Sequence, residues 1–235
     1  MNLKKIISKA MMGSFLLASP TAAEPLYVNT EITHYQMDKG QDEGEKDLAR
    51  ISLTDKLEES WLFVKSFDGK EVWFENGLNE SEGSVVFDVE VLKRILESEN
   101  IEKIVFYHTH PALLDTNDIS QIPSAFDILS DVYLIQLIKG WRPELLCHVE
   151  SKVVVSTGIY ALKYNPEIFF DFEKMGLLEK TSYEVMEENR KVEEGNSEFD
   201  YSFPNFDNFG ILNKNFASKY SNDFIQITFR DGNDE

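Results

Sequence analysis

The amino-acid sequence predicts a mixed α+β domain in which one central, mixed β-sheet is flanked by helices. Three observations support this prediction. A hydrophobic share of 42% over 235 residues is enough for one sizeable buried core. Short runs rich in β-branched and aromatic residues, typical of strands, recur along the chain. Between them lie stretches with apolar residues at helical spacing, and elements in this order pack as a sheet covered by helices.

The expected sheet starts with a β-hairpin. Two strand-like runs, Trp61–Ser66 and Glu71–Phe74, flank the dipeptide Asp68-Gly69. An Asp-Gly pair between two such runs is typical of a tight turn, because glycine readily adopts the positive φ that the turn requires. The elements expected after the hairpin are a strand at Ser84–Val89, a helix at Val89–Glu99, a strand at Ile104–Tyr107, a helix at Ser124–Lys139 and strands at Leu145–Val149, Val153–Ser156 and Tyr160–Tyr164.

The helix expected at Ser124–Lys139 is amphipathic. We expect Gly140 to end it and Pro143 to prevent its continuation. The residues of its predicted apolar stripe are Phe126, Leu129, Val132, Tyr133 and Leu137.

The segments on either side of this core differ from it in composition. Lys39–Lys46 is rich in Gly, Asp and Glu, which predicts a loop. Further on, Thr181–Glu194 predicts a charged helix, Phe199–Phe209 combines aromatic residues with Asp and Asn, and Phe224–Phe229 alternates like a terminal strand. We divide the chain into a signal peptide (1–23), an N-terminal segment (24–55), the main domain (56–165) and an acidic, aromatic-rich C-terminal extension (166–235). The extension either wraps the domain or forms a separate interaction surface.

The charge balance argues against nucleic acid as a partner. The chain has 23 basic and 42 acidic residues, a net charge of −19. Such a charge repels phosphate backbones, and no compact basic patch offsets it. We therefore expect no nucleic-acid binding. The oligomeric state stays open.

The N-terminus has the layout of a secretory signal peptide. Lys4, Lys5 and Lys9 precede the short apolar stretch Ala10–Ala18, and small residues follow up to Ala23. The stretch is too short to span a membrane permanently. We expect cleavage near Ala23, export to the periplasm or the medium, and no stable membrane span afterwards. An ordinary amphipathic first helix is the alternative.

Cysteine and two of the four histidines offer no further site. Cys147 is the only cysteine, so no internal disulfide can form, and its apolar neighbours predict a buried position. His34 and His148 have no partner at the spacing of metal ligands.

Two histidines and one aspartate form the candidate metal site. If Ile104–His110 is a strand, His108 and His110 point to the same face, because side chains alternate along a strand. Pro111 ends the strand there, which leaves the histidines at a rim that a substrate can reach. Catalytic zinc usually takes three protein ligands and a water, and Asp127 is the best third ligand.

Alternatives to this interpretation exist. Ser124-x-x-Asp127 is also an ordinary helix-capping pattern, with the serine as N-cap. Asp115 and Asp118 compete with Asp127 as third ligands.

The run His108-Thr109-His110-Pro111, followed by Ser124-Ala125-Phe126-Asp127, resembles the signature of the JAMM/MPN-domain zinc metalloprotease family, His-x-His-Pro and then Ser-x-x-Asp. That family also carries a glutamate at the head of an early strand. Glu59 stands at that place, and its neighbour Glu58 is an alternative. One departure is that Asp127 lies farther along the chain than in the family, which indicates an insertion in the loop 112–122 beside the site.

The resemblance covers Lys56–Tyr164 and implies a cytidine-deaminase-like (MPN) fold with one Zn²⁺ per chain. The implied metal ligands are His108, His110 and Asp127. The implied substrate is a protein or peptide, cleaved at a peptide or isopeptide bond.

The resemblance also implies two catalytic residues. Glu59 would be the general base, and Ser124 would stabilise the oxyanion. Two other functions stay open: a catalytically inactive MPN-like scaffold, and a zinc hydrolase of cell-wall peptide cross-links.

Overall fold

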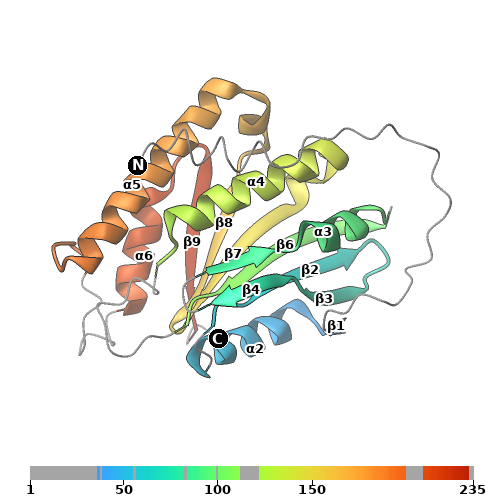
Figure 1. Cartoon of the computed structure of the whole chain (residues 1–235), viewed down its shortest axis with the longest axis horizontal. Coiled ribbons are helices and arrows are strands. Elements are labelled where there is room, and N and C mark those ends of the chain that lie inside the picture. Colours follow the sequence, from blue (N-terminus) through green and yellow to red (C-terminus); the bar gives the residue numbers. More distant parts are fainter. Residues whose placement is uncertain are drawn as a thin grey trace. The chain divides into compact units, whose positions relative to one another are not determined.

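The computed structural model describes residues 36–37, 39–54, 57–81, 84–98, 100–111, 122–199 and 209–232 (Figure 1). All of them belong to one compact unit, Ile32–Glu235. The expected signal peptide, His34, Asp115 and Asp118 lie outside the described residues.

Seven strands form one mixed sheet in the order β1-β3-β2-β6-β7-β8-β9. Only β6 and β7 run parallel, and every other neighbouring pair in this sheet is antiparallel. The strands are β1 (Gln36–Met37), β2 (Ser60–Ser66), β3 (Glu71–Glu75), β6 (Ile101–Thr109), β7 (Val149–Val155), β8 (Gly158–Tyr164) and β9 (Ile225–Asp231). A separate two-stranded sheet joins β4 (Gly77–Ser81) to β5 (Ser84–Phe87).

Helices flank the seven-stranded sheet on both faces, which confirms the predicted mixed α+β class with a central mixed sheet (Figure 1). The helices are α2 (Gln41–Thr54), α3 (Val89–Leu96), α4 (Ala125–Trp141), α5 (Phe172–Glu193) and α6 (Phe209–Tyr220), with short 3₁₀ helices η2 (Pro143–His148) and η3 (Pro166–Phe170). Within the described part of the chain, no helix combines the length and the apolar character needed to span a membrane.

Side chains of β2 and β6 alternate between two hydrophobic cores. The larger core, which includes residues of α3, α4, α5 and α6, takes Leu62, Val64, Ile104 and Phe106 from these strands. The smaller core, which includes Leu48 of α2, takes Trp61, Phe63, Val105 and Tyr107. Both faces of the two strands are therefore buried, and the core that a side chain joins shows which face of the sheet it lies on.

The predicted hairpin is confirmed. β2 and β3 pair antiparallel around the turn at Phe67–Gly69. Gly69 has φ of 84°, a conformation that favours glycine, and its N–H donates to the carbonyl of Ser66 at 2.9 Å.

The prediction of a loop at Lys39–Lys46 is wrong, because α2 begins at Gln41. Gly44 is not a loop signal. A Cβ at this position would lie 2.2 Å from the indole of Trp73, so glycine lets the helix approach the sheet closely.

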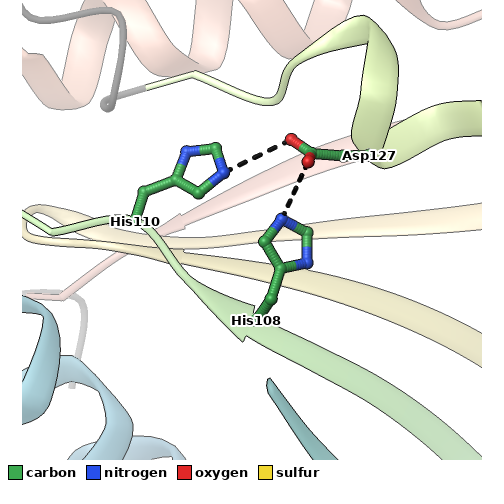
Figure 2. Close-up of side chains that lie close together, drawn as sticks. All are labelled: His108, His110 and Asp127. Atoms are coloured by element: carbon green, nitrogen blue, oxygen red, sulfur yellow. Dashed lines mark ion pairs between the residues drawn. The ribbon is translucent and has the colours of Figure 1, made fainter. Parts of the chain in front are cut away.

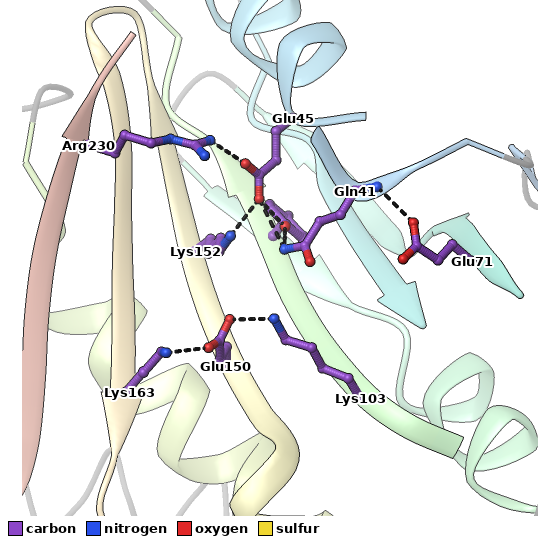
Figure 3. Close-up of polar contacts among 9 residues, drawn as sticks. Gln41, Glu45, Glu71, Lys103, Glu150, Lys152, Lys163 and Arg230 are labelled. Atoms are coloured by element: carbon purple, nitrogen blue, oxygen red, sulfur yellow. Dashed lines mark hydrogen bonds and ion pairs between the residues drawn. The ribbon is translucent and has the colours of Figure 1, made fainter. Parts of the chain in front are cut away.

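A buried polar network also ties α2 to the sheet (Figure 3). Glu45 accepts hydrogen bonds from Lys152 and from Tyr107, each at 2.5 Å, and pairs with Arg230. Burial alone would raise the pKa of Glu45, but the nearby Lys152 ammonium and these hydrogen bonds lower it overall. The network joins α2 to three strands of the sheet.

Two further predictions are wrong. Leu145–Val149 was expected to be a strand, but the 3₁₀ helix η2 occupies Pro143–His148, with Pro143 in its first turn. Strand β7 starts at Val149, which pairs with Ile104. Cys147 lies in η2 and is exposed rather than buried.

The chain beyond residue 165 adds to the same sheet. β9 pairs antiparallel with β8 over its whole length. α5 packs against α4, and α6 packs against β9. Aromatic side chains at Tyr160, Phe216 and Phe229 form part of this contact, with ring centroids 4.8 to 6.0 Å apart.

Candidate metal centre

The carboxyl end of β6, the central strand of the sheet, presents both histidines of the candidate site. His108 lies in β6, opposite Val153 of β7, and His110 follows the strand end. The N–H of His110 donates to the carbonyl of Val154 at 2.8 Å, which fixes the chain just past the strand. The two imidazole rings have centroids 5.1 Å apart, and only 3% and 5% of the two residues are exposed.

Asp127 reaches the histidines from the first turn of α4. It forms a capping box with the N-cap residue Ser124: the Ser124 N–H donates to Asp127 Oδ2 at 2.6 Å, and the Asp127 N–H donates to Ser124 Oγ at 3.2 Å. The capping pattern expected as an alternative is therefore present, and it holds the carboxylate in place beside the imidazoles.

Figure 2 shows both imidazole rings turned toward the Asp127 carboxylate. His108 Nε2 lies 3.2 Å from Oδ1, and His110 Nε2 lies 3.4 Å from Oδ2. Burial alone would raise the pKa of Asp127, but the two nearby imidazoles of His108 and His110 hold it well below its ordinary value. The aspartate is thus an anion that faces two ring nitrogens.

This arrangement fits a metal ion. One ligand atom from each of the three residues lies within 4.8 Å of the others. Tetrahedral zinc with bonds of about 2.0–2.2 Å sets neighbouring ligand atoms about 3.3–3.6 Å apart, and each imidazole nitrogen lies at a similar distance, 3.2 Å and 3.4 Å, from one of the two Asp127 oxygens. Among the described residues, neither ring nitrogen of His108 has a hydrogen-bond partner, although both are buried. The His-His-Asp group can therefore hold a metal ion.

The structure brings Glu58, and not Glu59, to this group. Ser60 pairs with His108, so residues of the same parity on β2 share the face of the histidines. Glu58 has this parity. Its pKa is raised overall. Burial raises it most, the nearby His110 and His108 lower it, and the Asp127 carboxylate raises it.

Glu59 points to the opposite face of the sheet. Its carboxylate accepts a hydrogen bond from Trp61 Nε1 at 2.9 Å, and it lines a surface pocket together with Lys39 and Arg50 near α2. Its backbone is tied to β6, because its N–H donates to Thr109 Oγ1 at 2.9 Å and its carbonyl accepts from the Thr109 N–H at 2.9 Å.

Asp131, one helical turn after Asp127, is a buried acid that the sequence did not single out. It accepts hydrogen bonds from Ser151 Oγ at 2.7 Å and from the Tyr164 hydroxyl at 2.8 Å. Burial raises its pKa to about 7. These contacts tie α4 to β7 and β8, and so hold Asp127 against the strand that carries the histidines.

The predicted stripe of α4 explains why Asp131 was missed. Phe126 is 67% exposed and Tyr133 is 45% exposed, so that stripe is wrong. The buried residues of α4 are Ala125, Ile128, Asp131, Leu134, Ile135 and Ile138. An acid among apolar residues at helical spacing is the signal that could have found it.

Comparison of the chain with protein-family models, with curated proteins and with solved structures finds no match.

Proposed function

We infer that this protein is a metal-dependent hydrolase that cleaves a peptide or isopeptide bond. The observation that supports this most is the group formed by the buried His108 and His110 and the partly buried Asp127, with one ligand atom of each within 4.8 Å of the others. A structural zinc site usually has four protein ligands, whereas three leave a position for water and substrate.

Zinc is the ion that we propose for this ligand set. Two imidazole nitrogens and one carboxylate oxygen are typical of catalytic zinc sites, whereas Mg²⁺ and Ca²⁺ prefer oxygen ligands alone. We expect one ion per chain, held by His108, His110 and Asp127. When bound, zinc supplies a Lewis acid and lowers the pKa of a coordinated water.

Glu58 is the proposed proton carrier. Burial raises the pKa of its carboxylate, so it takes up a proton more readily than an exposed glutamate does. It accepts a proton from the attacking water and then passes that proton to the leaving amine. Asp127, whose pKa is held low, stays an anion throughout.

Ser124 is the proposed donor to the oxyanion. Its Oγ accepts the N–H of Asp127, so the capping contact leaves the hydroxyl proton for another partner. The hydroxyl lies at the start of α4, where backbone N–H groups also favour negative charge.

The substrate is proposed to be a protein or peptide outside the cytoplasm, because the N-terminal sequence resembles a signal peptide. Metal analysis and turnover test the proposal together. We expect about one zinc per purified chain, hydrolysis of members of peptide and isopeptide libraries, and loss of both in the His108→Ala/His110→Ala variant. Equal zinc content in that variant would remove the proposal.

Two other results would favour a different function. A zinc-loaded chain that cleaves no member of the libraries would indicate a scaffold. Cleavage of purified peptidoglycan alone would indicate a hydrolase of cell-wall cross-links.

A further inference from the structure

Three buried polar residues form a row across the sheet beside the candidate metal centre. Ser60 of β2 stands opposite His108 of β6. On the other side of β2, the N–H of Asn76 donates to the Ser60 carbonyl at 2.8 Å, one residue after β3 ends. The row therefore crosses three adjacent chain segments.

The three side chains point to the same face of the sheet. Two residues further along, Leu62 pairs with Phe74, and both contribute to the core that includes α3 and α4. Because side chains repeat every second residue, Ser60 and Asn76 share that face with His108. Directly opposite residues, here Asn76 with Ser60 and Ser60 with His108, have Cβ atoms about 5 Å apart, so one molecule above Ser60 is within reach of the side chains on both sides.

All three side chains have unpaired polar atoms. Asn76 and Ser60 are 0% exposed and His108 is 3% exposed. Among the described residues, no hydrogen-bond partner exists for Asn76 Oδ1 and Nδ2, for Ser60 Oγ, or for either ring nitrogen of His108. Buried polar atoms without a partner are rare in proteins, because leaving such a bond unmade is costly.

One of these five atoms is accounted for by the candidate metal centre. His108 Nε2 faces Asp127 Oδ1 at 3.2 Å. The other four are two acceptors, Asn76 Oδ1 and Ser60 Oγ, and two nitrogens that can donate, Asn76 Nδ2 and His108 Nδ1. A buried water makes up to four hydrogen bonds, two as donor and two as acceptor, and so matches this set.

We propose that one ordered water binds between Asn76, Ser60 and His108 and receives the Nδ1–H of His108. The bond orients the ring and keeps the proton on Nδ1, so that the lone pair of Nε2 can bind the proposed metal ion. Histidines that bind metals usually donate their other N–H to such a partner, and the partner strengthens metal binding. Asn76 and Ser60 are therefore positioning residues; this part rests on the proposed metal site.

The water is tested first in the unaltered chain. A crystal structure of the metal-free, full-length protein, at a resolution that defines ordered waters, is expected to show one water within hydrogen-bond distance of all three side chains. Direct hydrogen bonds among the three side chains, or a site without water, would overturn the proposal. This result does not depend on metal binding, so it stays separate from the proposed function.

The positioning role is tested by metal affinity. In Asn76→Leu and Ser60→Ala, the dissociation constant for Zn²⁺, measured by competition with a chromophoric chelator, is expected to rise about 10–100-fold. Asn213→Leu and Ser52→Ala are matched controls, since both positions are buried and lie outside the site, and they are expected to keep the wild-type affinity. Unchanged affinity in a folded Asn76→Leu variant would overturn the positioning role.

Discussion

Glu59 accepts a hydrogen bond from Trp61 Nε1 at 2.9 Å, and this contact lies on the face of the sheet that α2 covers. Glu58, its neighbour, has the opposite parity and lies close enough to the His-His-Asp group for the charges of that group to act on its pKa. The side chains of these two adjacent glutamates thus lie on opposite faces of the sheet.

The first prediction separates these two glutamates. Glu58→Gln removes the proton carrier, so kcat is expected to fall about 10²–10⁴-fold while the zinc content stays at the wild-type level. Glu59→Gln, the matched control, is expected to keep kcat close to wild type. Both values are measured on zinc-loaded protein with the best substrate from the libraries. An equal loss in the two variants would contradict the assignment.

The sequence could not decide between these glutamates for a physical reason. On a half-buried strand, the alternation of apolar and polar residues shows which side chains face the core. In β2, Leu62 and Val64 enter one core while Trp61 and Phe63 enter the other, so both parities are apolar. The class of fold, the hairpin and most strands followed from local patterns, whereas the face of a residue depended on partners far away in the chain.

The same limit applies to α2 and α4. In α2, the close contact with Trp73 requires Gly44, although a glycine among acidic residues is typical of a loop. In α4, apolar residues occur on several sides of the helix, so spacing alone did not identify the buried side that contains Asp131. By contrast, the pairing of His108 with His110 followed from the alternation of side chains along a strand, and Asp127 was selected by the combination of His-x-His-Pro with Ser-x-x-Asp.

The second prediction separates the capping role of Asp127 from its role as a ligand. Asp127→Asn keeps an oxygen that can accept the Ser124 N–H, but it removes the anion, so metal binding is expected to fall below detection while the metal-free protein stays folded. Ser124→Ala is expected to lower stability by about 0.5–2 kcal/mol and to keep one metal per chain. Metal analysis and urea unfolding measure the two effects. Full metal content in Asp127→Asn would exclude Asp127 as a ligand.

The third prediction concerns pH. The pKa of Asp131 is raised from 3.8 to about 7 in the folded chain. As the pH rises, the unfolded chain therefore releases this proton at a lower pH than the folded chain does. The stability from this group is fully present below about pH 4, is lost as the pH rises, and is gone above about pH 7, a change on the order of 4 kcal/mol.

The comparison of wild type with Asp131→Asn isolates this change. Urea unfolding of both metal-free proteins is measured between about pH 4 and pH 8. All other ionisable groups are shared by the two proteins. The unfolding free energy of wild type is therefore expected to fall relative to that of Asp131→Asn as the pH rises. A difference that does not vary with pH would show that Asp131 is ionised in the folded protein.

The last prediction uses two glycines in helices. A Cβ at Gly44 would meet the Trp73 indole at 2.2 Å, so Gly44→Ala forces α2 away from the sheet and is expected to cost about 1–3 kcal/mol in unfolding free energy. At Gly140, near the end of α4, nothing lies within 4 Å of the same added atom, so Gly140→Ala is expected to stabilise the protein by up to about 1 kcal/mol. Alanine favours the helix at both positions, and only the contact with Trp73 differs. Stabilisation by both substitutions in urea unfolding would mean that α2 does not press on Trp73, and that the glycine has no role in seating the helix.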